Sequence, residues 1–222
     1  MAGIIDPWKL KLATWDPEQI EGFESVLSIG NGRMGQRANF EEAYSGSSLQ
    51  GSYLAGVYYP DKTRVGWWKN GYPEYFAKVL NSANWIGVDV KVGGETLDLA
   101  RAQSVDHFAW ELNMKDGVLK RSFACTLESG SSVQVKAERF CSMHNPELGC
   151  LRYTIKAKDC PVQLIPYIDA GVTNLDSNWD DAFWVVHEAK HRGPRQAYVR
   201  AETNKTRFGT AFAMTVAAYT GR

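Results

Sequence analysis

Three short motifs in the sequence have residue types and spacings that could bind a cofactor or a metal ion. The first is Gly30-Asn31-Gly32-Arg33-Met34-Gly35, which has the spacing G-x-G-x-x-G. In a dinucleotide-binding fold this spacing joins a strand to a helix, and its backbone amides bind a pyrophosphate. Residues 36–42 lack the periodicity of an amphipathic helix. We therefore interpret Gly30, Asn31 and Gly32 as a tight structural turn whose glycines take positive φ, with no nucleotide bound.

The second motif is His187-Glu188-Ala189-Lys190-His191, which has the spacing H-E-x-x-H. That spacing binds zinc when a helix places both imidazoles on one face. The preceding residues 183–186 are aromatic and β-branched, and Gly193-Pro194 interrupts the chain soon afterwards, so a strand is favoured. Positions four apart on a strand are too distant to share one ion. We predict a solvated strand and turn here.

The third motif, residues 176–180, resembles the start of an EF-hand calcium loop. Asp181 and His187 stand where that loop needs Gly and Glu, so we predict a polar loop without calcium. No metal site is assigned anywhere in the chain. No nucleophile or catalytic acid is assigned either, because the partners of a catalytic set meet in the fold and not along the sequence.

Aromatic and polar side chains that could bind a ligand lie together in the glycine-rich and polar stretch 61–72. Its candidate residues are Trp67, Trp68, Lys69, Asn70 and Tyr72. Adjacent tryptophans are costly to leave in water, so something should cover them. They could pack on this domain or on another domain. Alternatively, a tryptophan face could stack on a pyranose ring while Lys69 or Asn70 hydrogen-bonds a hydroxyl group.

The elements that must position these motifs are mostly strands. Hydrophobic residues alternate with polar ones along 132–138 and 151–157, a period of two that predicts half-buried strands. Further strands are predicted at 87–92, 118–127, 162–168, 184–187, 196–203 and 210–217. One short helix is predicted over Pro73–Leu80, beginning at its proline. Many short strands separated by turns predict a mainly β fold, an antiparallel β-sandwich with few short helices. We expect residues 1–222 to form a single domain.

Composition excludes several classes of partner. Lys plus Arg and Asp plus Glu number 25 each, so no cationic excess is present to bind nucleic acid. The four cysteines form no C-x-x-C pair and are predicted to be reduced and mostly buried. The sequence shows no signal-peptide pattern at its start and no apolar run long enough for a membrane span. We expect a soluble, cytoplasmic protein; a signal peptide removed earlier would leave the same sequence.

The segment from Glu24 to Glu42 resembles the start of glycoside hydrolase family 65 proteins, which run E-S-x-F-S-x-G-N-G-x-x-G-x-R-G-N-F-E-E. Similar stretches follow in the family's order at 51–58, 84–87, 111–119 and 139–143. Leu27 stands where the family usually has Phe, and Ala38 where it usually has Gly. The resemblance extends over about residues 15–173.

The resemblance implies an N-terminal antiparallel super-sandwich of an enzyme whose (α/α)6 catalytic barrel and small C-terminal domain are absent from this chain. It implies that the catalytic acid and the phosphate-binding residues lie on that barrel. The implied parent reaction is inverting phosphorolysis, or hydrolysis, of an α-linked glucose disaccharide such as maltose, kojibiose or trehalose. Inorganic phosphate would be its co-substrate, and no other cofactor is expected.

Two functional hypotheses remain open at this point. In the first, the chain is a non-catalytic domain that supports the barrel, is inactive alone and takes part in a homodimer. In the second, it is a free-standing carbohydrate-binding module that uses surface aromatic residues. The strand-like residues 212–219 are followed by only three residues, and we expect the first hypothesis, with the chain cut from a longer polypeptide.

Overall fold

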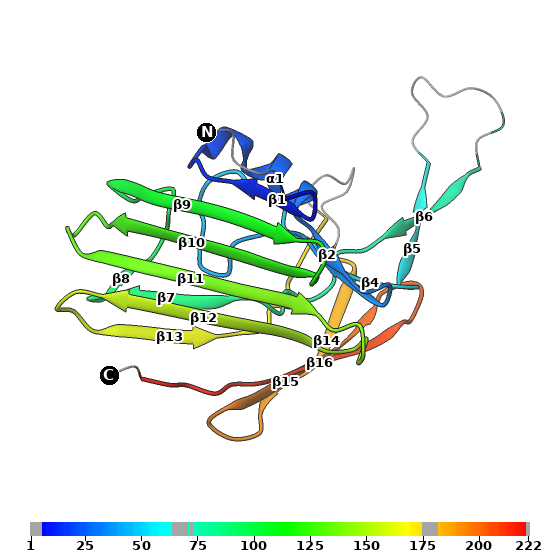
Figure 1. Ribbon diagram of the computed structural model, residues 1–222. Coiled ribbons are helices and arrows are strands. Elements are labelled where there is room, and N and C mark those ends of the chain that lie inside the picture. Colours follow the sequence, from blue (N-terminus) through cyan, green and yellow to red (C-terminus); the bar gives the residue numbers. More distant parts are fainter. Residues whose placement is uncertain (1–5, 64–70, 72, 175–181, 221–222) are drawn as a thin grey trace. The chain divides into compact units, whose positions relative to one another are not determined.

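The computed structural model describes residues 6–63, 71, 73–174 and 182–220. Among these described residues, strands account for 48% and helices for 5%. All pairings between named strands are antiparallel among the described registers, and the predicted mainly β sandwich is confirmed (Figure 1). None of the helices in the described residues is long and apolar enough to cross a bilayer.

The chain divides into two compact units, each built from two segments. Unit 1 comprises residues 1–51 and 86–167, and unit 2 comprises residues 52–85 and 168–222. Each unit is described here by itself. The expectation of a single domain over residues 1–222 stays a prediction.

Unit 1 contains a five-stranded sheet in the order β1-β9-β10-β11-β12. Its strands are β1 (Lys9–Leu12), β9 (Ser104–Asn113), β10 (Val118–Thr126), β11 (Ser132–Cys141) and β12 (Gly149–Ala157). A three-stranded sheet has the order β13-β7-β8, with β13 (Val162–Pro166), β7 (Val88–Val92) and β8 (Glu95–Thr96). Unit 1 also contains the antiparallel hairpin of β2 (Ile29–Gly30) and β3 (Met34–Gln36).

The core of unit 1 follows from the period-two pattern. Alternate residues of β11 are buried, beginning with Val133 and Val135, and so are all three valines of β7, which occupy alternate positions. Aromatic side chains fill the space near β9, where Trp110 stacks on Phe40 with ring centroids 5.3 Å apart. The same inward row of β11 includes Arg139, so this core also encloses charge.

A short helical segment, η1 (Pro17–Gln19) followed by α1 (Ile20–Val26), precedes the β2–β3 hairpin. Asp16 caps its start, because its carboxylate accepts a hydrogen bond from the backbone N–H of Glu18 at 3.1 Å. Ile20 and Glu24 lie on the buried side of α1. This helix was not predicted from the sequence.

Unit 2 contains β4 (Ser52–Leu54), the hairpin β5 (Tyr58–Lys62) and β6 (Tyr75–Val79), and a three-stranded sheet in the order β14-β15-β16. That sheet comprises β14 (Trp184–His191), β15 (Gln196–Thr203) and β16 (Gly209–Thr215). A small apolar cluster joins Tyr59, Leu80 and Phe183, with Trp184 packed against it.

The eight predicted strands are all confirmed, but the predicted helix over Pro73–Leu80 is wrong. Residues 75–79 form β6 and pair with β5, from Tyr58 opposite Val79 to Lys62 opposite Tyr75. Aromatic and β-branched side chains favour a strand, and these cross-strand pairs outweigh the weak helix signal of one proline.

Strand β9 is a second difference, because no strand was predicted there from periodicity. The register between β9 and β10 shifts between Ser122 and Ala124, and His107 takes a φ of 52° at this irregularity. An inserted residue reverses the alternation of faces midway along the strand, so the period of two is not visible over its full length.

Candidate functional site

The turn Gly30-Asn31-Gly32 connects β2 to β3 in unit 1. Gly32 has a φ of +83°, a conformation that favours glycine. The carboxamide oxygen of Asn31 accepts hydrogen bonds from the backbone N–H groups of Arg33 at 3.0 Å and Met34 at 2.9 Å. These two amides are therefore engaged within the turn and do not form a free cradle for a pyrophosphate.

Gly30 requires a correction, since its φ does not lie in the positive region that we predicted. It belongs to β2 and pairs with Gly35. A Cβ placed on Gly30 would lie 3.1 Å from the carbonyl oxygen of Met34. The absence of a side chain at Gly30 thus serves close approach of two strands, whereas at Gly32 it serves backbone conformation.

Asn31 also joins the turn to a distant loop, residues 142–148. Its Nδ2 donates hydrogen bonds to the carbonyl oxygens of Ser142 at 2.7 Å and Pro146 at 3.0 Å. The Arg33 guanidinium lies 3.8 Å from the Glu147 carboxylate. Both segments carry part of the resemblance described above, and the structure brings them together at one end of unit 1.

A buried charged cluster follows directly after this turn in the sequence. Arg121 donates from Nη1 and Nη2 to the two carboxylate oxygens of Glu42, at 2.6 and 2.5 Å, and also binds Glu41. Arg139 binds Glu41 and donates to the carbonyl oxygen of Asn39 at 2.8 Å. The Tyr153 hydroxyl donates to Glu42 at 3.3 Å. Two carboxylates thus balance two guanidinium groups in the interior of unit 1.

The cluster is suited to holding the fold and not to acid–base chemistry. Burial alone would raise the pKa of the Glu41 carboxyl, but Arg121 and Arg139 outweigh it and hold the pKa below its ordinary value. Burial also raises the pKa of the Tyr153 hydroxyl well above its ordinary value. Both groups therefore keep one protonation state near neutral pH.

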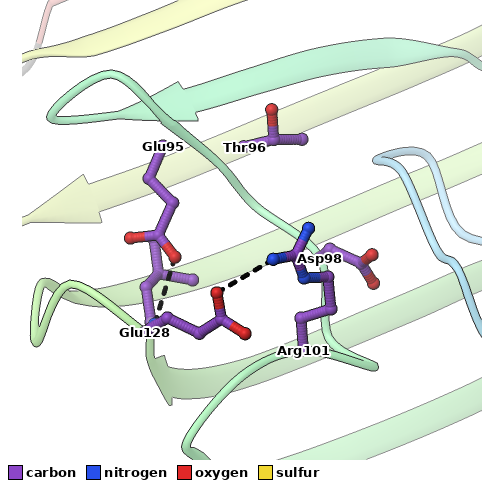
Figure 2. A pocket seen from close by; sticks show the side chains of 6 residues that line it. Glu95, Thr96, Asp98, Arg101 and Glu128 are labelled. Atoms are coloured by element: carbon purple, nitrogen blue, oxygen red, sulfur yellow. Dashed lines mark hydrogen bonds and ion pairs between the residues drawn. The ribbon is translucent and has the colours of Figure 1, made fainter.

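A surface pocket of about 300 Å³ lies beside β8 and is lined by Glu95, Thr96, Asp98, Arg101, Leu127 and Glu128. Figure 2 shows Arg101 paired with Glu128, at 3.0 Å, and Glu95 bonded to the backbone of Glu128. The Asp98 carboxylate accepts from the N–H groups of Ser45 and Ala100. The carboxylates of the pocket are thus engaged by protein donors.

Within the pocket, Glu95 is not suited to act as a catalytic acid. The hydrogen bond from Ser129 lowers the pKa of Glu95, which is therefore ionised at neutral pH. The other described carboxyls with a shifted pKa, in Glu41, Glu111 and Glu188, shift in the same direction. Among the described residues the pocket can bind polar groups at its surface, but it is not arranged as a general-acid site.

The remaining predicted sites are placed as follows. Trp67, Trp68, Lys69, Asn70 and Tyr72 lie outside the described residues, as do residues 176–181 of the EF-hand-like segment. His187 lies on strand β14 as predicted, but the strand continues past the predicted end at residue 187 and includes His191; His187 Nε2 is 4.0 Å from Glu202. In the described part of the chain, no three or more His, Cys, Asp or Glu side chains lie close enough together to hold a metal ion. The four cysteines are free thiols, with Cys125 and Cys141 buried.

The buried cluster was missed by sequence reasoning, although Glu41 and Glu42 were part of the family resemblance. Two adjacent glutamates at the end of a recognised segment gave one signal. Arg121, within the predicted strand 118–127, gave another, as did Arg139, which directly follows the predicted strand 132–138 at the next position of its hydrophobic row. A charged residue in an inward row needs a partner of opposite charge, so those two signals together could have indicated an internal ion pair.

Comparison with known proteins defines the class of this fold. Residues 10–221 match "Glycosyl hydrolase family 65, N-terminal domain". A solved structure named "Putative kojibiose phosphorylase from human microbiome" superimposes with a TM-score of 0.80 at 20% identity, over 95% of this chain and 30% of that chain. The fold is therefore the N-terminal β-sandwich found in carbohydrate-active enzymes of this kind. The chain belongs to glycosyl hydrolase family 65.

Relatives identify the enzymes to which the domain is similar. Maltose phosphorylase of Bacillus subtilis (strain 168) is 45% identical over 208 residues, which are 93% of this chain and 27% of that protein. Kojibiose phosphorylase of Halothermothrix orenii is 28% identical, over 67% of this chain and 17% of its own length. Alpha,alpha-trehalose phosphorylase of Thermoanaerobacter brockii is 28% identical, over 71% of this chain and 21% of its own length. The chain spans less than a third of the length of each of these relatives.

Proposed function

We propose that the chain is the non-catalytic N-terminal domain of a phosphorylase that cleaves an α-linked glucose disaccharide, with maltose as the first candidate substrate. The observation that carries this proposal is the 45% identity to a maltose phosphorylase over 93% of the chain. Identity to the kojibiose and trehalose phosphorylases is lower, at 28%. Maltose is therefore favoured over the other two sugars.

The proposed reaction needs a nucleophile and a proton donor. A phosphate oxygen forms the new bond to the anomeric carbon, and the bond from that carbon to the bridging oxygen breaks. The bridging oxygen takes a proton from a carboxylic acid, and the products are β-glucose 1-phosphate and glucose. Inorganic phosphate is already nucleophilic, so one acidic residue suffices.

The non-catalytic role is supported by the state of the described carboxyl groups. A general acid must retain its proton near neutral pH, which requires a raised pKa. Wherever a carboxyl pKa is shifted in the described residues, it is lowered. The carboxylates of the surface pocket are also held by backbone amides or by Arg101. The catalytic acid is accordingly proposed to lie elsewhere in a longer polypeptide.

The test compares residues 1–222 with the proposed longer polypeptide that contains this chain. Each is incubated with maltose, kojibiose or trehalose, with and without phosphate, and glucose 1-phosphate and free glucose are measured. We expect phosphate-dependent release from maltose by the longer polypeptide and none by residues 1–222. Release by residues 1–222 alone would contradict the non-catalytic role, and phosphate-independent glucose release would identify a hydrolase.

The carbohydrate-binding module is the competing function. It requires that residues 1–222 bind maltose or a longer glucan with no other domain present, which titration calorimetry measures directly. Saturable binding by residues 1–222, together with an open reading frame that stops at Arg222, would replace the present proposal. Sedimentation of the longer polypeptide tests the proposed homodimer in the same preparation.

A further inference from the structure

Asn31 and Gly32 form an Asn-Gly pair, a dipeptide whose asparagine side chain is prone to deamidation. Because glycine has no Cβ, its backbone nitrogen is open to the side chain of the preceding residue. In this reaction the Gly32 nitrogen bonds to Asn31 Cγ, the bond from Cγ to Nδ2 breaks, and Nδ2 leaves as ammonia with the proton of the Gly32 N–H. Water then opens the cyclic imide to aspartate or isoaspartate. Gly32 is exposed and Asn31 is half-buried, so water reaches the pair.

The folded protein holds the Asn31 carboxamide at four points. Its oxygen accepts from the N–H groups of Arg33 at 3.0 Å and Met34 at 2.9 Å. Its Nδ2 donates to the carbonyl oxygens of Ser142 at 2.7 Å and Pro146 at 3.0 Å. Attack on Cγ turns the planar carboxamide into a tetrahedral centre, and loss of Nδ2 removes two of the four bonds. The hydrogen bonds therefore oppose deamidation for as long as the turn stays closed.

The aspartate product would keep one half of these contacts and lose the other half. A carboxylate accepts hydrogen bonds but donates none. One oxygen can still accept from the N–H groups of Arg33 and Met34, so the β2–β3 turn stays bonded. The second oxygen, in the place of Nδ2, faces the carbonyl oxygens of Ser142 and Pro146, which have no proton to share. Deamidation thus separates the turn from the loop 142–148.

The remaining described contact between the side chains of turn and loop is weak. The Arg33 guanidinium lies 3.8 Å from the Glu147 carboxylate, and these two side chains are 61% and 76% exposed. Ion pairs between exposed side chains contribute little to stability. The carboxamide of Asn31 is therefore the main polar connection between the turn and the loop among the described contacts.

We propose that Asn31 is a deamidation site, at which the loss of one ammonia irreversibly frees the loop 142–148 from the β2–β3 turn. Water is the only co-reactant, and no enzyme is required. The four hydrogen bonds delay the reaction, so its rate follows the local opening of the turn. The site acts as a chemical record of how often this end of unit 1 opens, and it does not depend on the proposed phosphorolysis.

The rate of deamidation in folded and unfolded protein gives the first test. Residues 1–222 are incubated with and without urea at mildly alkaline pH, and peptide mass spectrometry follows the conversion of each asparagine. Asn70-Gly71 is the same dipeptide and serves as the internal reference in urea. We expect the two pairs to react at similar rates in urea, and Asn31 to react about tenfold more slowly, or slower still, in the folded protein.

Two outcomes of this experiment would overturn the proposal. Equal rates at Asn31 with and without urea would show that the four hydrogen bonds give no protection. A stable Asn31 in urea, while Asn70 reacts, would show that the position is not a deamidation site.

Asn31→Asp reproduces one product and tests its effect on the loop. Hydrogen exchange of the backbone in 142–148 should rise about tenfold or more, while exchange in the peptide that contains Met34 stays unchanged. Asn145→Asp is the matched control, since it places the same charge in the same loop. The Asn145 side chain accepts from the N–H of Glu147 at 3.3 Å, a bond that a carboxylate retains. Unchanged exchange in Asn31→Asp, or an equal rise in both variants, would refute the release of the loop.

Ser142→Ala tests the connection from the side of the loop. The Ser142 hydroxyl oxygen accepts from the N–H of Asn145 at 3.0 Å, so its removal loosens the loop without changing Asn31. Deamidation of Asn31 in the folded protein should become several-fold faster, with the rate in urea unchanged. Ser104→Ala, which removes a hydroxyl bonded to Asp106 in β9, is the control and should leave both rates unchanged. A folded-state rate in Ser142→Ala equal to that of the parent would show that the loop does not protect Asn31.

Discussion

Arg121 and Glu42 form a two-point ion pair in the interior of unit 1, with both guanidinium Nη atoms bound to both carboxylate oxygens at 2.6 and 2.5 Å. The two residues are 79 positions apart in the sequence. The guanidinium also lies over the Phe40 ring, with its carbon 4.5 Å from the ring centroid. The pair therefore connects the segment after the glycine turn to the centre of the five-stranded sheet.

Removing one member of this pair should strongly destabilise the protein. Arg121→Met leaves Glu42 buried without its main partner, and we expect a loss of about 3–5 kcal/mol in the free energy of unfolding. Lys120→Met is the matched control, because Lys120 is the neighbouring residue and forms an exposed pair with Glu138 at 3.2 Å. That control should cost less than about 1 kcal/mol. Urea denaturation measures both, and equal losses would contradict the assigned role of the cluster.

The glycine turn allows a test of whether Gly32 is required for its backbone conformation or because a side chain would not fit. Gly32→Ala places a side chain at a φ of +83°, where no neighbouring atom lies within 4 Å, so its cost of about 1 kcal/mol should be conformational. Gly22→Ala is the control, since Gly22 is helical and equally open. Alanine should be neutral or stabilising there by about 0.5–1 kcal/mol. Thermal unfolding measures the stability of both variants relative to the parent. A Gly32→Ala protein as stable as the parent would refute the turn interpretation.

Acid should weaken the fold through Glu41. Its pKa is lowered in the folded state, so its contribution to stability is present above the ordinary pKa of 4.5 and is lost as the pH falls toward the folded value. The free energy of unfolding of the parent should therefore decline below about pH 4.5. A Glu41→Gln protein should start from lower stability near neutral pH and lose less on acidification. Parallel declines in the two proteins would exclude Glu41 as a source of the acid sensitivity.

The tryptophan pair remains a prediction from sequence, because Trp67 and Trp68 lie outside the described residues. If they contact the sugar in the proposed longer enzyme, Trp67→Ala and Trp68→Ala should raise its Michaelis constant for the proposed disaccharide while the melting temperature stays near the parent's. If they only pack against protein, stability should fall while the kinetics of the folded fraction stay unchanged. Steady-state kinetics and thermal melting of the same samples distinguish the two cases.

The regular strands were predictable because burial on one face imposes a period of two. Residues 196–203 match β15 at both ends, and 132–138 lie within β11. Residues 73–80 and 104–113 were not predictable from the same rule. In β6 the partner strand decides the conformation, and in β9 the irregularity at His107 reverses the alternation.

The candidate site was harder to predict from the sequence than the fold. The turn at Gly32 could be predicted, since few residues other than glycine adopt its backbone conformation. The bonds from Asn31 to Ser142 and Pro146 could not, because they join positions more than a hundred residues apart. The buried partners of Arg121 and Arg139 could not be predicted for the same reason. Long-range polar contacts depend on the strand order, which one sequence does not specify.

The interleaving of the two units has a consequence for synthesis on the ribosome. Unit 1 uses residues 1–51 and 86–167, so all of its strands are available once Tyr167 has been translated. Unit 2 at that moment has only β4, β5 and β6, and a lone two-stranded hairpin is marginal in water. Its sheet β14-β15-β16 is translated last. The nascent chain should therefore pass through a stage in which unit 1 is folded and residues 52–85 of unit 2 are not yet folded. During this stage chaperones and proteases can bind that segment.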